Sequence, residues 1–335
     1  MELKKSIILF FIFFVQSFTD CFAMENKIEI RSVFNSNDIF CAVKTNDIPG
    51  VDNRYSALEG SGMLTSSSNS LLVLENGFND FTLQVGALSW FTDTNKNREP
   101  KISFAPGAYC NVALTLFSGN ARKVITDLKV TVDSNDRPQV HSSEFNKYKI
   151  DNKKIMGWQV EKGYVDDDYF IENLYPKGMT VYQFTQKVYL KDLPEWKWVK
   201  ATPFVGKPEQ ILALQNAYDE LWRLFAAKDN NAIKRKLEIS LDAWSIATGS
   251  DANKLYNGYD FVESFKLNTF KMIPINWNDY TLEITNKGRL VRFVNKSDPT
   301  IYPISYDVVA DDGVPEMRSF TPFFAIIDGK VTPVI

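Results

Sequence analysis

Histidine is nearly absent from this 335-residue sequence, in which His141 is the only one. A zinc site built from several histidines is therefore excluded, and a Ser-His-Asp or Cys-His catalytic arrangement would depend on His141 alone. His141 lies in the polar stretch SNDRPQVHSSEFNK, which has no apolar frame and is typical of an exposed loop. We therefore predict no catalytic residue, no metal site and no cofactor.

An excess of charge of one sign is also lacking, because 38 Lys and Arg face 41 Asp and Glu, for a formal net charge of -3. This balance gives no field that would attract a polyanion, so we do not expect a nucleic acid partner. The fractions of apolar residues, 44%, and charged residues, 24%, are those of a globular protein. Since single hydrophobic cores stop growing at about 250 residues, the length predicts two domains.

The apolar run at the N-terminus is the feature that predicts the cellular address. Lys4 and Lys5 precede apolar residues 7–15, and a polar stretch then ends in Ala23. The run is shorter than the ~20 residues that a membrane span needs, and the pattern is that of a secretory signal. We predict cleavage after Ala23 and a periplasmic or secreted protein without stable membrane insertion. The alternatives are an uncleaved anchor and a lipid on Cys21, although the residues before Cys21 resemble a lipobox poorly.

Two cysteines, Cys41 and Cys110, remain once residues 1–23 are removed. An even pair in a chain sent to an oxidising compartment predicts one disulfide. The alternative is two free thiols or half of a metal site, but no CxxC spacing is present.

Residues 24–202 are predicted to form an all-β domain. KIEIRSVF and IFCAVK alternate apolar and polar residues, as half-buried strands do, and turn signals such as NSND separate them. We interpret Ser61–Ser70 as a flexible loop and LLVLENGFNDFTLQVGALSWF as two strands joined at residues 75–80. Several short strands without a convincing helix predict a β-sandwich of jelly-roll or immunoglobulin-like type.

Two segments near the end of this domain are candidate interface regions. One is the acidic triplet Asp166, Asp167 and Asp168 with Tyr169; its spacing differs from that of a calcium loop, so a solvated turn is the alternative to a functional role. The other contains Trp196 and Trp198, which would pack between the domains or, with Trp90, provide a platform for stacking glycans.

Residues 203–335 are predicted to form an α+β domain that begins with a helix over residues 208–229. Its apolar residues fall on one stripe, with spacings of three and four: Ile211, Leu214, Tyr218, Leu221, Trp222 and Phe225. Two shorter helical segments follow, ending near residues 249 and 266. From there the period changes to two, and Asp328-Gly329 is a hairpin turn signal.

The order of helices and strands in LQNAYDELWRLFAAKDNNAIKRKL through FFAIIDGKVTPVI resembles the nuclear transport factor 2-like superfamily, also called SnoaL-like or cystatin-like. The resemblance covers about 130 residues and implies helices packed on a curved antiparallel sheet. It also implies a binding and dimerisation module, so a homodimer is permitted. In an enzyme of this family the cone would hold the reactive groups, and the candidate pocket residues here are Tyr218, Trp222, Tyr306 and Asp307. We predict that Tyr218 and Trp222 fill the cone.

The signal peptide together with LENGFNDFTLQVGALSWF and LPEWKWVKATPF resembles exported bacterial proteins that serve as periplasmic immunity proteins against secretion-system toxins. This resemblance implies a non-catalytic protein that binds and neutralises a secreted antibacterial toxin. The alternatives are an envelope protein that binds a ligand or glycan, and an enzyme that uses the pocket around Asp307.

Overall fold

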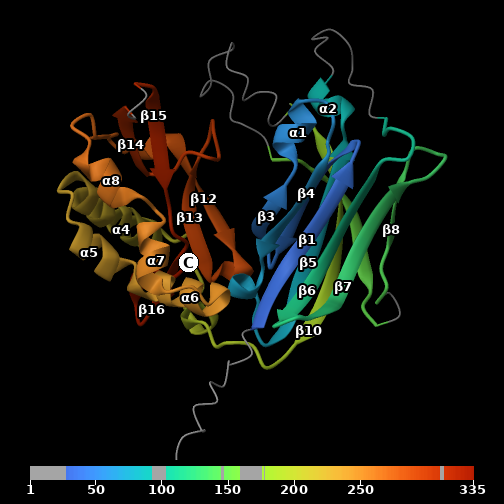
Figure 1. Cartoon of the computed structure of the whole chain (residues 1–335), viewed down its shortest axis with the longest axis horizontal. Helices are drawn as coiled ribbons and strands as arrows, with labels where there is room; N and C mark the ends of the chain where they lie inside the picture. The colour runs from blue at the N-terminus through green and yellow to red at the C-terminus, as the bar shows by residue number, and fades with distance from the viewer. Residues whose placement is uncertain (1–27, 93–102, 145–146, 159–175, 177, 310–312) are drawn as a thin grey trace, which may run out of the picture.

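The computed structural model describes residues 28–92, 103–144, 147–158, 176, 178–309 and 313–335. Within them, the first part of the chain forms two five-stranded antiparallel sheets (Figure 1). Sheet I has the order β4 (Leu64–Asn69), β1 (Ile28–Asn37), β6 (Tyr109–Ser118), β7 (Ala121–Val132) and β8 (Pro138–His141). Sheet II has the order β3 (Ile48–Asp52), β2 (Ile39–Thr45), β5 (Gly77–Ala87), β10 (Thr180–Leu190) and β9 (Ile150–Met156). Short helical segments connect them: α1 (Arg54–Leu58), η1 (Leu71–Val73), α2 (Ser89–Thr92) and, after β10, η2 (Lys197–Lys200).

Side chains from both sheets meet in one buried apolar cluster. Along β1, alternate residues such as Ile30 and Phe34 are buried, because successive side chains of a strand point to opposite faces. Val43 and Leu83 of sheet II belong to the same cluster. The predicted disulfide is confirmed: Cys41 of β2 and Cys110 of β6 are bonded and fully buried, so the bridge ties sheet II to sheet I.

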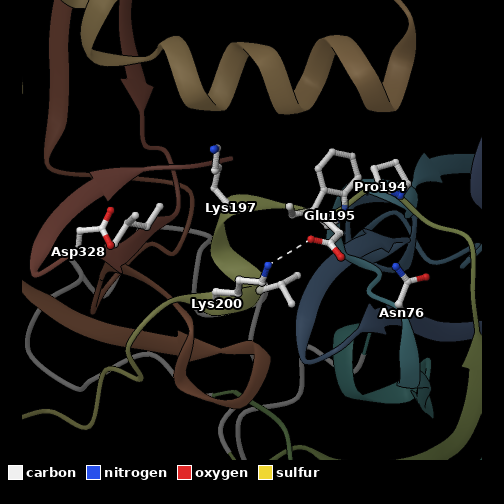
Figure 2. Close-up of a pocket in the computed structure, with 9 residues that line it drawn as sticks. Asn76, Pro194, Glu195, Lys197, Lys200 and Asp328 are labelled. Carbon is white, nitrogen blue, oxygen red and sulfur yellow. Dashed lines mark hydrogen bonds and ion pairs between the residues drawn. The ribbon is translucent and has the colours of Figure 1, made fainter.

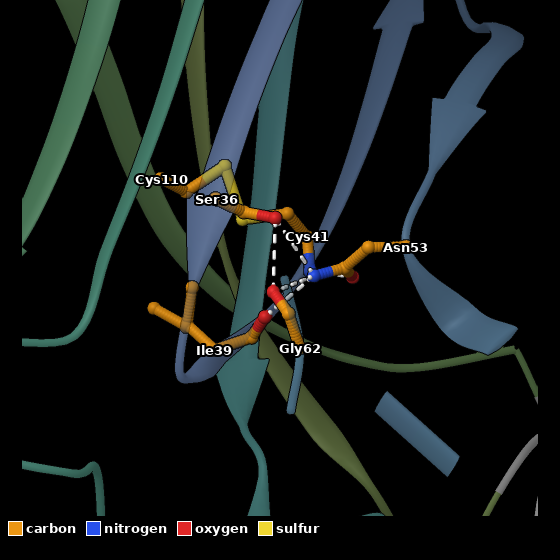
Figure 3. Close-up of a disulfide and its surroundings, with 6 residues drawn as sticks. All are labelled: Ser36, Ile39, Cys41, Asn53, Gly62 and Cys110. Atoms are coloured by element: carbon orange, nitrogen blue, oxygen red, sulfur yellow. Dashed lines mark hydrogen bonds between the residues drawn. A yellow bond between two sulfur atoms is a disulfide. The ribbon is translucent and has the colours of Figure 1, made fainter. Parts of the chain in front are cut away.

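Asn53 organises the chain beside this disulfide (Figure 3). Its Nδ2 donates to Ile39 O and Gly62 O, both at 2.7 Å, and its Oδ1 accepts from Cys41 N–H at 2.7 Å. The Asn53 side chain is buried, so each of these bonds satisfies a polar group that water does not reach. Gly62 is held close to β2 as a result.

Gly62 is expected to tolerate no side chain. Its φ is +53°, and a Cβ there would lie 2.7 Å from Ile39 O. Gly62→Ala should lower the free energy of unfolding by more than about 1 kcal/mol, measured by chemical denaturation. Gly119→Ala is the matched control, because Gly119 has a φ of +54° and nothing within 4 Å. Equal losses for the two variants would contradict a steric clash at Gly62.

Two local predictions in this part of the chain are wrong. Residues 71–73 form the 3-10 helix η1 rather than a strand, because Val73 O accepts from Asn46 Nδ2 and Leu74 O from Trp196 Nε1 instead of from a neighbouring strand. Most of the serine-rich stretch 61–70 forms β4, which pairs with β1. The small polar side chains of β4 do not prevent main-chain pairing at the edge of a sheet.

The second part of the chain begins with five helices: α4 (Pro208–Ala226), α5 (Asn230–Lys236), α6 (Glu238–Thr248), α7 (Ala252–Asn257) and α8 (Phe261–Lys266). Sheet III follows with the order β12 (Tyr280–Thr285), β13 (Leu290–Asn295), β16 (Phe324–Ile327) and β17 (Lys330–Pro333). Sheet IV has the order β11 (Lys271–Met272), β14 (Ile304–Val309) and β15 (Pro315–Phe320). The short turns η3 (Trp277–Asp279) and η4 (Asn286–Gly288) flank β12.

The apolar stripe predicted for the first helix is confirmed in α4, which packs on both of these sheets. Tyr218 contacts the rings of Phe293 and Phe324 in sheet III, and Phe225 contacts those of Tyr306 and Phe320 in sheet IV. Helix α4 therefore holds the two sheets in one core, and it lies on the side away from sheets I and II (Figure 1).

The helix stops and turns in this part follow the sequence signals. Gly249 ends α6 with a φ of +59°, and the Asp251 side chain caps α7 by accepting from Asn253 and Lys254 N–H. Asp328-Gly329 joins β16 to β17, both residues with positive φ. None of the helices in the described part of the chain is long and apolar enough to cross a membrane.

Candidate binding cleft

An ion cluster joins the second part of the chain to the first. The Glu75 carboxylate, with only 7% of its side chain exposed, accepts from Arg289 Nη1 at 2.7 Å and from Arg289 Nη2 at 2.8 Å. Lys287 Nζ lies 2.5 Å from Glu75 Oε1. Arg289 also donates to Val199 O and to both oxygens of Asn286. Such bidentate, charge-assisted bonds fix orientation as well as distance.

Burial alone raises the pKa of the Glu75 carboxyl, but the hydrogen bonds and charges of Arg289 and Lys287 outweigh burial. The pKa of Glu75 is therefore held below its ordinary value of 4.5. The carboxylate is ionised at neutral pH, and the cluster is a charged one.

The turn η4 brings both cations to Glu75. Asn286, Lys287 and Gly288 all have positive φ, a run that turns the chain tightly between β12 and β13. Asn286 N–H donates to Asn46 O at 3.0 Å, so the turn also bonds to the main chain between β2 and β3. Asn46 in turn bonds to Asn79 at 2.8 Å, and Asn79 to the main chain of Glu75. The junction is a continuous polar network.

A cleft of about 620 Å³ lies between the outer face of sheet II and sheet III. In Figure 1, β12 is the strand of sheet III nearest to β3. One wall comes from β2, β3, β5 and the chain at the end of β9. The other comes from β12, β13 and the loop after β13. Among the lining residues are three large apolar side chains that remain exposed: Met156 at 60%, Trp158 at 39% and Ile284 at 41%. A cleft of this size with exposed apolar side chains has the properties of a binding site.

Two ion pairs are among the charged groups that line the cleft. Arg292 Nε lies 2.5 Å from Glu283 Oε2, and its guanidinium lies over the rings of Phe323 and Tyr302, at 4.3 and 5.2 Å from their centroids. On the opposite wall Arg54 Nη2 lies 2.8 Å from Asp52 Oδ2. These pairs present fixed charges to a ligand.

A smaller hollow of about 340 Å³ lies beside η2 (Figure 2). Asn76, Glu195, Lys197, Lys200 and Asp328 are among its lining residues, and Lys200 Nζ lies 3.3 Å from Glu195 Oε2. The side chains of that ion pair are 82% and 76% exposed, so water competes strongly for both charges.

The four candidate pocket residues lie apart from the cleft. Tyr218 and Tyr306 are buried in the second core, and Tyr218 Oη bonds to Thr321 Oγ1 and accepts from Phe293 N–H. Burial raises the pKa of the Tyr218 hydroxyl. Trp222 is half-buried and donates to Ile273 O at 2.8 Å, whereas Asp307 is exposed on the opposite face of β14 from Tyr306. The structure brings Tyr218 and Trp222 into the core and leaves Asp307 outside it.

The candidate interface residues divide into two groups. Asp166, Asp167, Asp168 and Tyr169 lie outside the described residues. Trp196 and Trp198 are 4% and 1% exposed, and Arg289 lies over the Trp198 ring at 5.2 Å from its centroid. With Trp90 also only 9% exposed, none of the three tryptophans offers a ring face for stacking a glycan. His141 is exposed at the end of β8.

Sequence reasoning missed the residues that build the cleft and its junction, above all Glu75, Arg289, Arg292 and Trp158. The stretch NKGR between two apolar strands is a turn signal, but nothing in the sequence places its lysine and arginine beside Glu75. Comparison of the chain with protein-family models, curated proteins and solved structures finds no match in any of the three. Among the residues that the structure describes, no three His, Cys, Asp or Glu side chains converge as metal ligands would.

Proposed function

We propose that this chain is an exported, non-catalytic binding protein that recognises a protein partner in the cleft between sheets II and III. In this proposal sheets I and II form a β-sandwich domain, and residues 203–335 form a nuclear transport factor 2-like domain. A signal peptide over residues 1–23 directs the chain to the periplasm. The partner we favour is a secreted antibacterial toxin, which would make the chain its immunity protein.

The cleft carries this proposal. It combines exposed apolar side chains, which serve as anchors in interfaces, with charges already fixed in ion pairs. The Glu75 cluster supports it, because a rigid junction keeps the two walls at a constant distance and lowers the entropic cost of binding. The inter-sheet disulfide is compatible with a location outside the cytoplasm.

Affinity capture tests the proposal. The purified chain, used as bait in extracts of its own cells, is expected to retain one protein that is toxic when expressed alone and harmless when expressed with the chain. Ile284→Asp in the cleft should weaken this binding by more than about tenfold, measured by calorimetry. The matched control is Leu212→Asp on α4, which is 57% exposed and lies outside the cleft. Unchanged toxicity on co-expression, or equal effects of the two variants, would contradict the proposal.

An envelope protein that binds a small ligand or glycan is the second candidate. One observation favours it: Trp158 lines the cleft with 39% of its surface exposed, and Gln84 is another of the lining residues. In that case Trp158→Ala would abolish binding of an oligosaccharide, while Ile284→Asp would leave capture of any protein unchanged.

A further inference from the structure

Strand β12 forms an edge of sheet III, and its pairing with β13 shows which main-chain groups it leaves free. Phe293 N–H donates to Tyr218 Oη at 3.2 Å, so Phe293 and its opposite residue Leu282 form a pair without ladder hydrogen bonds. Lys296 N–H donates to Asp279 O at 2.8 Å, so Asp279 and Lys296 form a hydrogen-bonded pair. Hydrogen-bonded and non-hydrogen-bonded pairs alternate along an antiparallel ladder, which agrees with a non-hydrogen-bonded pair at Leu282 and Phe293. The N–H and C=O groups of Leu282 and Ile284 therefore point away from β13.

Just beyond β12, the chain on this same edge already bonds to the main chain between β2 and β3. Asn286, two residues beyond Ile284, donates its N–H to Asn46 O at 3.0 Å. Within the described part of the chain, the outward main-chain groups of Leu282 and Ile284 have no such partner. Leu282 and Ile284 are two residues apart, and free N–H and C=O groups at alternate residues are what an added strand pairs with.

This free edge is recessed. Residues 281–285 line the cleft, and the outer face of sheet II lies across from them. Exposed, flat edges are a liability for aggregation, and a facing wall limits what can reach this one. The cleft volume of about 620 Å³ is the space that a bound segment would occupy beside this edge.

We propose that the cleft binds an extended segment of the partner protein, which adds as a strand to the free edge of β12. This inference rests on the proposed function and specifies how the partner is held. Residues directly opposite each other across two strands interact, so apolar side chains of the segment would face Leu282 and Ile284. A lysine or arginine would face Glu283, whose Oε2 is bonded to Arg292. The segment therefore alternates apolar and basic residues.

A peptide probe tests strand addition directly. The probe is an acetylated, amidated pentapeptide of sequence VKVKV, and its binding to the purified full chain is followed by the amide NMR signals of β12 and by calorimetry. Two further probes carry N-methyl groups, one on the odd and one on the even residues. Only one of these two should lose binding, by about tenfold or more, because only alternate N–H groups face β12. Equal affinity of the two methylated probes would overturn the proposal, and so would the absence of binding by VKVKV.

A second peptide tests whether the segment must carry basic side chains. A probe of sequence VEVEV should bind about tenfold more weakly than VKVKV, because its carboxylates would face Glu283. Equal binding of the two would overturn the predicted basic character of the segment.

The proline variant Ile284→Pro tests the edge from the side of the protein. The proline removes the outward N–H of residue 284 and leaves the bonds that Glu283 makes to β13. VKVKV should therefore bind to Ile284→Pro about tenfold more weakly than it binds to Ile284→Ala. The thermal midpoint of unfolding should be the same for Ile284→Pro and Ile284→Ala, which would show that the proline variant keeps the fold. If the proline variant does not fold, the two methylated probes still test strand addition on the unaltered chain.

The outcomes separate this inference from the proposed function. If the captured toxin binds Ile284→Pro as well as the unaltered chain, strand addition is wrong while the binding function stands. If sedimentation shows that the chain alone is a dimer that Ile284→Pro dissociates, a second copy occupies the edge, and the proposed occupant is wrong. If VKVKV binds as predicted but no toxin is captured, the edge is a peptide site and the immunity function fails.

Discussion

Replacing Glu75 with glutamine is expected to lower the free energy of unfolding by about 3–5 kcal/mol, the cost of leaving a buried charge without its partner. Arg289, with 12% of its side chain exposed, would lose two charge-assisted bonds at 2.7 and 2.8 Å. The change is measured by chemical denaturation at neutral pH. Glu195→Gln is the matched control, because it removes an exposed ion pair with Lys200 and should have no measurable effect.

A loss from Glu75→Gln as small as that from Glu195→Gln would show that the ion cluster does not hold the junction. Arg289→Lys adds a finer test, since it keeps the positive charge but loses the planar fork that reaches both carboxylate oxygens. Arg289→Lys should lower the free energy of unfolding by less than Glu75→Gln does and by more than Glu195→Gln does.

The stabilising effect of Glu75 should also depend on pH. Its pKa in the folded state lies below the ordinary value of 4.5, so unfolding in acid takes up a proton at this group. The contribution is therefore fully present above about pH 4.5 and is lost as the pH falls through 4.5 toward the folded-state pKa. The difference in stability between the unaltered chain and Glu75→Gln should narrow over that range. A difference that stays constant down to pH 3 would contradict the assignment.

Removing the disulfide is the second change with a large expected effect. The bridge between Cys41 and Cys110 closes a loop with a sequence separation of 69, worth about 4 kcal/mol in the chain-entropy account. The double variant Cys41→Ala, Cys110→Ala should lose about this much, measured by urea denaturation. Reducing agent should destabilise the unaltered chain to a similar extent and leave the double variant unchanged. A double variant as stable as the unaltered chain would contradict a structural role for the bridge.

Much of the local structure could be predicted because it depends on nearest neighbours. The apolar stripe of α4 needs only spacings of three and four, and Gly249 and Asp328-Gly329 act through backbone conformation at the turn itself. The disulfide followed from counting the cysteines that remain after the predicted signal sequence. Several strands of sheets I and II followed from alternation, as β1 and β10 show.

The cleft and the junction beside it could not be predicted because the contacts that build them are long-range. Glu75 and Arg289 are 214 residues apart, and no periodicity links them. Glu75 stood in what resembled a hairpin turn, yet Leu71–Val73 coils into η1 because Asn46 and Trp196 supply the bonds that a second strand would have made. Trp196 and Trp198 were predicted either to pack between the domains or to form a stacking platform, and tertiary packing shows both buried.

The order of strands in sheet II has a consequence for how the chain folds. Strand β5 pairs with β10, and the paired side chains of Gln84 and Gln183 are 99 residues apart. Such non-local pairing makes folding slow, because loop-closure entropy is lost before the contacts form. A chain that leaves the ribosome from its N-terminus cannot complete sheet II until Leu190 has emerged, and until then β5 presents an unpaired edge. We therefore expect a refolding rate well below that of a helical domain of the same size.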